Sequence, residues 1–143
     1  MSSADIVVHI VDDEEPVRAS LAFLLTSSGY AARTHASAGA FLEVAPSIHN
    51  GCLITDLRMP EMDGVELLRR LKEAGHLLPA IVVTGHGDVQ MAVEAMKNGA
   101  LDFIEKPFSD EVLMASIARV VELAAERVRS EAAIEAIRER LAS

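Results

Sequence analysis

Five polar side chains stand at or just beyond the ends of apolar runs in this sequence, and their types fit phosphoryl transfer. They are Asp12, Asp13, Asp56, Thr84 and Lys106. Three carboxylates in one small crevice repel one another and raise one another's pKa unless a cation compensates. Oxygen ligands suit a hard cation such as Mg²⁺, which binds one or two carboxylates, waters and a substrate phosphate. These residues therefore predict a half-open magnesium site.

Asp56 is the candidate nucleophile beside that metal. A carboxylate can attack a phosphoryl group and carry it as an acyl phosphate, while a bound metal neutralises charge during the in-line attack. Lys106 would supply a fixed ammonium for a phosphate oxygen. Thr84 would supply a hydroxyl that can turn toward a new acceptor.

Alternating strands and helices must bring these side chains together. The apolar runs cover residues 6–11, 31–35, 52–55, 80–84 and 101–104. Between them lie helical stripes, which we expect to pack on the sheet: Val17, Leu21, Leu24 and Leu25; Val65, Leu68 and Leu71; Val89, Val93 and Met96. The alternation predicts an α/β fold, a doubly wound five-stranded parallel sheet with helices on both faces. Its flavodoxin-like strand order, 2-1-3-4-5, opens a crevice at the carboxyl ends of the first and third strands.

Composition narrows the class of protein. The chain has 143 residues, half of them hydrophobic, which suits one domain with a real core. A net charge of −9 opposes binding to nucleic-acid phosphates. No stretch approaches the roughly 20 apolar residues of a membrane span, and the lone Cys52 excludes an internal disulfide. We expect a cytoplasmic protein that itself binds neither nucleic acid nor membrane.

Four stretches carry a family resemblance: VDDEEPVR, DLRMPEMDG, VVTGHGD and GALDFIEKPF. In this order and spacing they resemble the receiver domain of bacterial response regulators (CheY-like superfamily), from residue 6 to about residue 123, and most closely the FixJ-type subgroup. The resemblance implies that Asp56 is the phosphoacceptor, and that Mg²⁺ is bound by Asp12, Asp13, Asp56 and the backbone carbonyl of Arg58. It also implies that Lys106 binds phosphate, that Thr84 and Phe103 form the switch, and that the Lys106–Pro107 bond is cis.

Arg58 departs from the short polar residue common at its position in the family. Only its backbone is needed for metal binding, so the departure concerns the rate of dephosphorylation. The resemblance further implies a sensor histidine kinase as phosphoryl donor, a phosphorylation-dependent homodimer through the face of the fourth helix, fifth strand and fifth helix, and only slow autodephosphorylation rather than enzyme turnover. FixJ-type regulators suggest transcription regulation, with nitrogen fixation as one pathway.

The C-terminal segment predicts a long helix. Apolar residues recur from Leu113 through Val128 and continue at Ile134, Ile137 and Leu141, without Gly or Pro. We interpret residues 1–123 as the receiver domain and residues 124–143 as a helical linker toward an absent output domain, by resemblance a DNA-binding one. Self-association of the linker as a short coiled coil is an open alternative to a free helix.

Each assignment has a simpler alternative. A strand-ending Asp such as Asp56 can cap the next helix. We interpret His86 as a solvated loop residue and His9 as a packed one. Two other functions compete: a Mg²⁺-dependent hydrolase with an aspartyl-phosphate nucleophile, and a module that binds partners without phosphorylation. Arg58 stands two residues after Asp56, where such a hydrolase needs an acid, and the complete set of polar residues argues against the second alternative.

Overall fold

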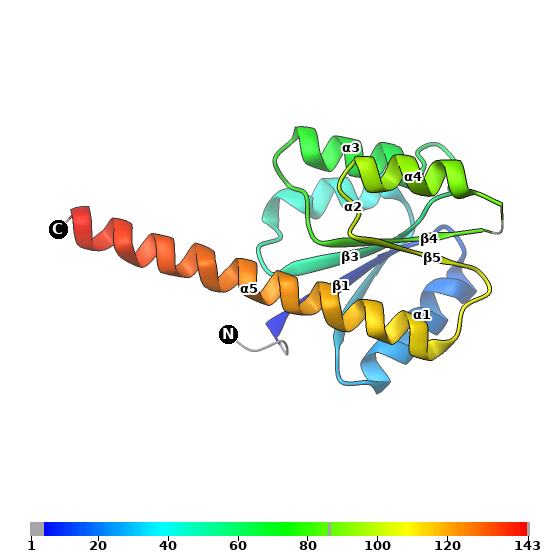
Figure 1. The fold of residues 1–143 in the computed structure, drawn as a ribbon, viewed down its shortest axis with the longest axis horizontal. Helices are drawn as coiled ribbons and strands as arrows, with labels where there is room; N and C mark the ends of the chain where they lie inside the picture. Colours follow the sequence, from blue (N-terminus) through cyan, green and yellow to red (C-terminus); the bar gives the residue numbers. More distant parts are fainter. Residues whose placement is uncertain (1–4, 86, 143) are drawn as a thin grey trace.

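The computed structural model describes residues 5–85 and 87–142. Five strands alternate with five α-helices, and a short 3₁₀ helix follows α2 (Figure 1). The strands are β1 (Val7–Val11), β2 (Ala31–His35), β3 (Gly51–Asp56), β4 (Ala80–Thr84) and β5 (Asp102–Glu105). The helices are α1 (Glu15–Ser27), α2 (Ala38–Val44), η2 (Ala45–Ser47), α3 (Gly64–Glu73), α4 (Val89–Lys97) and α5 (Asp110–Ala142). The predicted strands agree with these bounds to within one residue at each end.

The sheet is parallel throughout, in the order β2-β1-β3-β4-β5. One apolar core lies between the sheet and helices α1 and α5, and a second lies between the sheet and helices α2, α3 and α4 (Figure 1). Strands β3 and β4 are buried along their whole length, as expected for parallel strands covered on both faces. The predicted doubly wound α/β fold is confirmed.

The strand register decides which residues meet at the carboxyl edge. Val11 is paired with Thr55, and Asp56 with Val83. Thr84 is paired with Glu105. The residues that follow β1 and β5 in the chain therefore leave the sheet on either side of Asp56 and Thr84.

Helix α4 corrects one prediction. Val89, Val93 and Met96 were expected to pack on the sheet, yet they are among the exposed large hydrophobic residues, and the buried residues of α4 are Ala92 and Ala95. Methyl side chains let the helix approach the sheet closely, so the alanine face packs inward. Counting only large apolar residues assigned the wrong face, whereas the stripe on α1 is packed as expected, with Leu21 and Leu25 buried.

Helix α5 is the predicted long C-terminal helix, and its last turns extend away from the sheet (Figure 1). It packs on the core through Ala124 and Ala125, and Val128 is still partly buried against it. Ile134 and Ile137 are half exposed beyond that point. The proposed boundary between residues 123 and 124 thus falls within one continuous helix. Among the helices of the described segments, none is long and apolar enough to cross a membrane.

Two histidines, one buried and one partly buried, contact each other across the first two strands. His9 Nδ1 is 3.0 Å from His35 Nε2, and both rings contact Phe41 of α2. His9 is buried, as predicted. Burial, reinforced by the charges of His35 and Arg33, lowers the pKa of His9 to about 4, and burial also lowers the pKa of His35. Both rings are therefore neutral at pH 7.

The His9→Gln variant should have a shallower pH dependence of stability than the wild type. His9 in the unfolded chain binds a proton below about 6.5, whereas folded His9 does so only near 4, so the folded state loses stability as pH falls through this window. The slope due to one such group is at most roughly 1.4 kcal/mol per pH unit. Urea unfolding between these pH values measures it. Equal slopes for the wild type and the His9→Gln variant would contradict the prediction.

The Gly64→Ala variant should be destabilised by roughly 1–3 kcal/mol. A Cβ at Gly64 would lie 2.6 Å from the backbone oxygen of Asp56 and 3.1 Å from the Cα of Leu57, and neither backbone atom can move aside easily. The control is Gly39→Ala in α2, where the nearest atom would be 3.9 Å away; it should be neutral or slightly stabilised. Urea unfolding midpoints compare the two, and similar midpoints would refute the steric argument.

Candidate functional site

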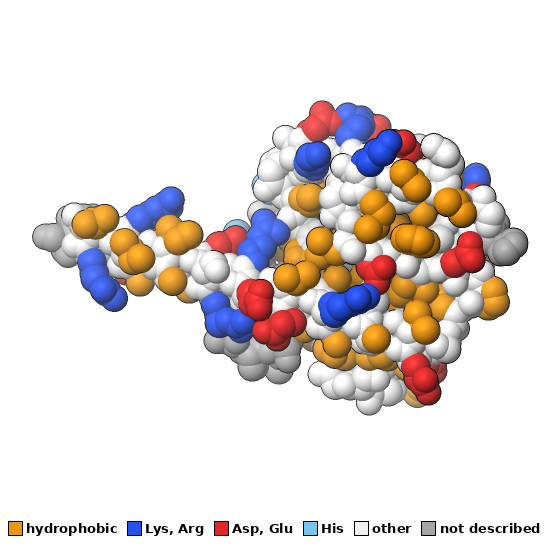
Figure 2. All heavy atoms as spheres, in the orientation of Figure 1, with side chains coloured by type: hydrophobic (Ala, Val, Ile, Leu, Met, Phe, Trp, Pro, Cys, Tyr) orange, Lys and Arg blue, Asp and Glu red, His pale blue; other side chains and the backbone are white. Residues whose placement is uncertain are grey.

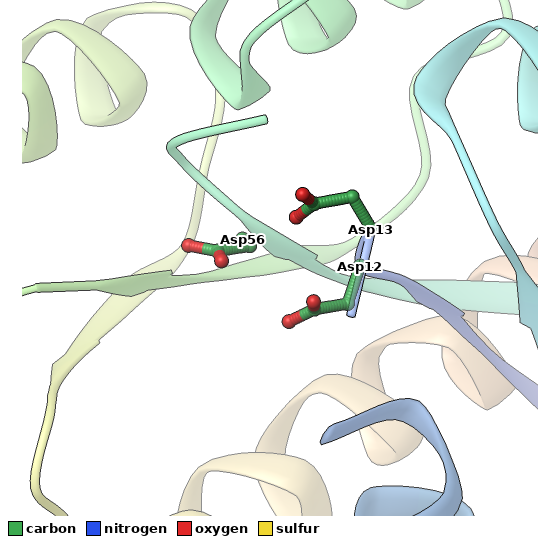
Figure 3. A group of neighbouring side chains, drawn as sticks. All are labelled: Asp12, Asp13 and Asp56. Carbon is green, nitrogen blue, oxygen red and sulfur yellow. The ribbon is translucent and has the colours of Figure 1, made fainter. Parts of the chain in front are cut away.

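Three carboxylates gather at the carboxyl edge of the sheet. Asp12 and Asp13 follow β1, and Asp56 ends β3. One oxygen from each lies within 4.8 Å of the others, and Figure 3 shows them around a common space. Asp12 and Asp56 are buried while Asp13 is exposed. This all-oxygen set, open on one side, fits a hard divalent cation such as Mg²⁺ that retains water ligands.

The environment of Asp12 shows how crowded this edge is. Burial raises the pKa of the Asp12 carboxyl, and the negative charges of Asp56 and Asp13 raise it further. The backbone amide of Glu14 donates a 2.9 Å hydrogen bond to Asp12 Oδ1, and this bond lowers the pKa, as does the charge of Lys106. The expected mutual repulsion is present, although burial is the larger cause.

Asp56 does not cap a helix. Helix α3 begins after Asp63, and the Asp63 side chain accepts a hydrogen bond from the amide of Glu66 at 2.8 Å. The Asp56 carboxylate instead lies beside Lys106, whose Nζ is 3.5 Å from Asp56 Oδ2. The simpler interpretation of Asp56 as a cap is therefore wrong, and its carboxylate remains directed at the acidic cluster and the lysine.

Thr84 and Lys106 are joined through the backbone. The Lys106 amide donates a 2.8 Å hydrogen bond to the carbonyl oxygen of Thr84, which places the lysine beside the end of β4. Thr84 is buried, and its hydroxyl donates to the carbonyl oxygen of Gly85 at 3.3 Å. The Lys106–Pro107 bond is cis, as the resemblance implied. Thr84 thus holds its hydroxyl on the loop that follows β4.

Phe103 lies on β5 with 45% of its surface exposed. It belongs to neither of the two buried cores. His86, interpreted above as a solvated loop residue, lies outside the described residues.

Two arginine contacts at this edge were not anticipated. Arg18 Nη1 donates to the backbone oxygen of Asp12 at 2.7 Å. The Arg58 guanidinium donates two hydrogen bonds to the Asp88 carboxylate, and these bonds lower the pKa of Asp88. For Arg58, the sequence predicted only that its backbone carbonyl binds the metal, and this role stays a prediction. A pairing across 30 residues leaves no local signal in the sequence.

Comparison with known proteins agrees with this geometry. The family model of the response regulator receiver domain matches residues 8–118. The chain is 64% identical over 118 residues to the transcriptional regulatory protein FixJ of Rhizobium meliloti (strain 1021), a match that covers 82% of this chain and 58% of that protein. It is 49% identical over 135 residues to FixJ of Azorhizobium caulinodans, covering 94% of this chain and 64% of that protein.

One solved structure is similar to this chain, and the match covers nearly the whole of that structure. The crystal structure of FixJ-N matches with a TM-score of 0.80 and 64% identity, covering 82% of this chain and 94% of that one. The chain spans about three fifths of the length of the two FixJ proteins. Since the family model covers most of the chain, and the sheet order and the acidic cluster agree with it, this chain belongs to the response regulator receiver domain family.

Proposed function

We propose that Asp56 accepts a phosphoryl group from a phosphohistidine of a sensor histidine kinase. A carboxylate oxygen of Asp56 attacks the phosphorus, the P–N bond breaks, and the imidazole of the donor keeps the electron pair. The observation that carries this proposal is the meeting of three carboxylates with Lys106, whose ammonium is 3.5 Å from Asp56. Asp12, Asp13, Asp56 and the carbonyl of Arg58 would hold Mg²⁺, which neutralises charge on the phosphoryl oxygens.

Lys106 and Thr84 have separate tasks in this reaction. Lys106 would bind a phosphoryl oxygen, because its ammonium already faces the carboxylate that receives the group. Thr84 would leave the carbonyl of Gly85 and donate its hydroxyl to the phosphoryl group. Slow hydrolysis of the acyl phosphate then returns the protein to its starting state. The chain would act as a switch and not as a turnover enzyme.

We propose that phosphorylation changes the shape of the face formed by α4, β5 and α5. Large apolar side chains are exposed there (Figure 2): Val89, Val93 and Met96 on α4, Leu101 before β5, and Phe103 on β5. Movement of Thr84 would vacate space under α4 into which Phe103 could rotate. The altered apolar surface would bind a second copy of the chain, which gives a phosphorylation-dependent homodimer.

The output of the switch would lie beyond the receiver. We propose that residues 1–123 form the receiver, that residues 124–143 link it to a DNA-binding output domain, and that the whole protein regulates transcription. Its similarity to FixJ proteins, described as transcriptional regulatory proteins, supports this role. Nitrogen fixation is one pathway consistent with the FixJ resemblance. A cytosolic location stays a prediction.

The two competing functions are less well supported. A hydrolase of the aspartyl-phosphate type needs an acid near the nucleophile, and the residue two positions after Asp56 is Arg58, whose guanidinium is paired with Asp88. A module that works without phosphorylation would have no need for Asp12, Asp13, Asp56, Thr84 and Lys106 together.

Incubation with Mg²⁺ and acetyl phosphate should add one phosphoryl group to the wild type and none to Asp56→Asn, because the amide is not a nucleophile of this kind. Intact mass measures the modification. The control is Asp63→Asn, since asparagine also caps helices and residue 63 is outside the acidic cluster; it should be modified like the wild type. Modification of Asp56→Asn would overturn the assignment. Rapid hydrolysis of unrelated phosphomonoesters by the wild type would favour the hydrolase.

Mg²⁺ should raise the free energy of unfolding of the wild type without any phosphoryl donor. Binding at ten times the dissociation constant stabilises a folded protein by about 1.4 kcal/mol. The Asp13→Asn variant should lose most of this gain, since Asp13 is an exposed member of the cluster and its replacement leaves the core intact. The control Glu43→Gln, on exposed α2 surface, should keep it. Thermal unfolding with and without Mg²⁺ provides the comparison, and equal shifts in all three proteins would place the metal elsewhere.

A further inference from the structure

The Arg58–Asp88 ion pair joins the two loops that follow β3 and β4. Arg58 Nε is 2.7 Å from Asp88 Oδ2, and Arg58 Nη2 is 2.6 Å from Asp88 Oδ1, so both carboxylate oxygens accept from one guanidinium. The Arg58 side chain is 69% exposed and that of Asp88 is 13% exposed. A two-pronged arginine–carboxylate contact fixes orientation as well as distance.

The position of Asp88 makes this contact unusual. Asp88 is the N-cap residue of α4, a place where aspartate normally accepts a hydrogen bond from the first turn. Ser37 and Asp63 do so for α2 and α3, but Asp88 makes no side-chain cap. Its carboxylate is turned toward Arg58 instead. The start of α4 is therefore tied to the loop that begins directly after Asp56.

The loop between β4 and α4 also holds the hydroxyl of Thr84. The carbonyl oxygen of Gly85 accepts from Thr84 Oγ1 at 3.3 Å and from the Asp88 amide at 3.3 Å. Gly85 and Gly87, which has φ +90°, offer no side chains that could restrain the loop. Contacts thus run from Arg58 to Asp88, from Asp88 to Gly85, and from Gly85 to Thr84.

We propose that Arg58 and Asp88 are positioning residues that keep the Thr84 hydroxyl on Gly85 and oppose its transfer to a phosphoryl group on Asp56. The inference rests on the proposed function. A phosphoryl group brings negative charge two residues from Arg58, where it competes with Asp88 for the guanidinium. Release of Asp88 frees the loop, and Thr84 then changes acceptor. The pair acts only through Thr84, which makes its role testable.

The test combines Arg58→Ala, Asp88→Asn, Thr84→Val and the double variant Thr84→Val/Asp88→Asn. Without a phosphoryl donor, the backbone amide of residue 88 should exchange its hydrogen faster in the Arg58→Ala and Asp88→Asn variants than in the wild type. With Mg²⁺ and beryllofluoride, a phosphoryl analogue, Asp88→Asn should bind the analogue roughly two- to fivefold more tightly, the range expected for loss of an exposed ion pair. In the Thr84→Val background, Asp88→Asn should bring no gain.

The matched control is Arg69→Ala on α3, which removes an exposed arginine paired with Glu66 and Glu73. This substitution should change neither the hydrogen exchange of the residue 88 amide nor the affinity for beryllofluoride. Unchanged exchange in Arg58→Ala and Asp88→Asn would overturn the inference, and so would an affinity gain that persists in the Thr84→Val background. A wild type that binds no beryllofluoride would overturn the proposed function itself, whereas equal binding by the wild type and Asp88→Asn would overturn only the inference.

Discussion

Crowding of negative charge at one edge of a parallel sheet is the constraint on which the rest of this structure depends. The register of β1 and β3 places Asp12, Asp13 and Asp56 together, with two of the three buried. Carboxylates in this arrangement need positive partners. The amide of Glu14 and the ammonium of Lys106 supply part of that compensation. A divalent cation, in the function that we propose, would supply the rest.

The surroundings of Asp56 are rigid on one side. The amide of Leu57 is bonded to the carbonyl of Val83, and the amide of Gly64 is bonded to the carbonyl of Leu57. A Cβ on Gly64 would lie 2.6 Å from the backbone oxygen of Asp56, so even a methyl group does not fit there. The acidic residue is therefore held by backbone contacts that do not depend on its own side chain, which leaves the carboxylate available for chemistry.

The side of the site formed by β4, α4 and β5 is built differently. Helix α4 turns its alanines inward and its large apolar residues outward, the loop before it contains two glycines, and Phe103 is half exposed. Elements held by fewer large buried side chains move at lower free-energy cost. In our proposal, this side carries the conformational change, and the pairing of Arg58 with Asp88 sets how readily it occurs.

Sequence patterns alone were sufficient to predict the alternation of strands and helices, the strand order and the long C-terminal helix. These features follow from local periodicity and from the geometry of parallel strands. The convergence of Asp12, Asp13, Asp56 and Lys106 was also predicted, since strand ends in a parallel sheet meet at one edge. Only the tertiary structure decided which face of α4 is buried, because methyl groups and larger apolar groups compete for the same surface. It alone revealed the contact of Arg58 with Asp88 and that of Arg18 with the backbone of Asp12. Such contacts depend on how separate segments lie in space, and no periodicity within a segment encodes them.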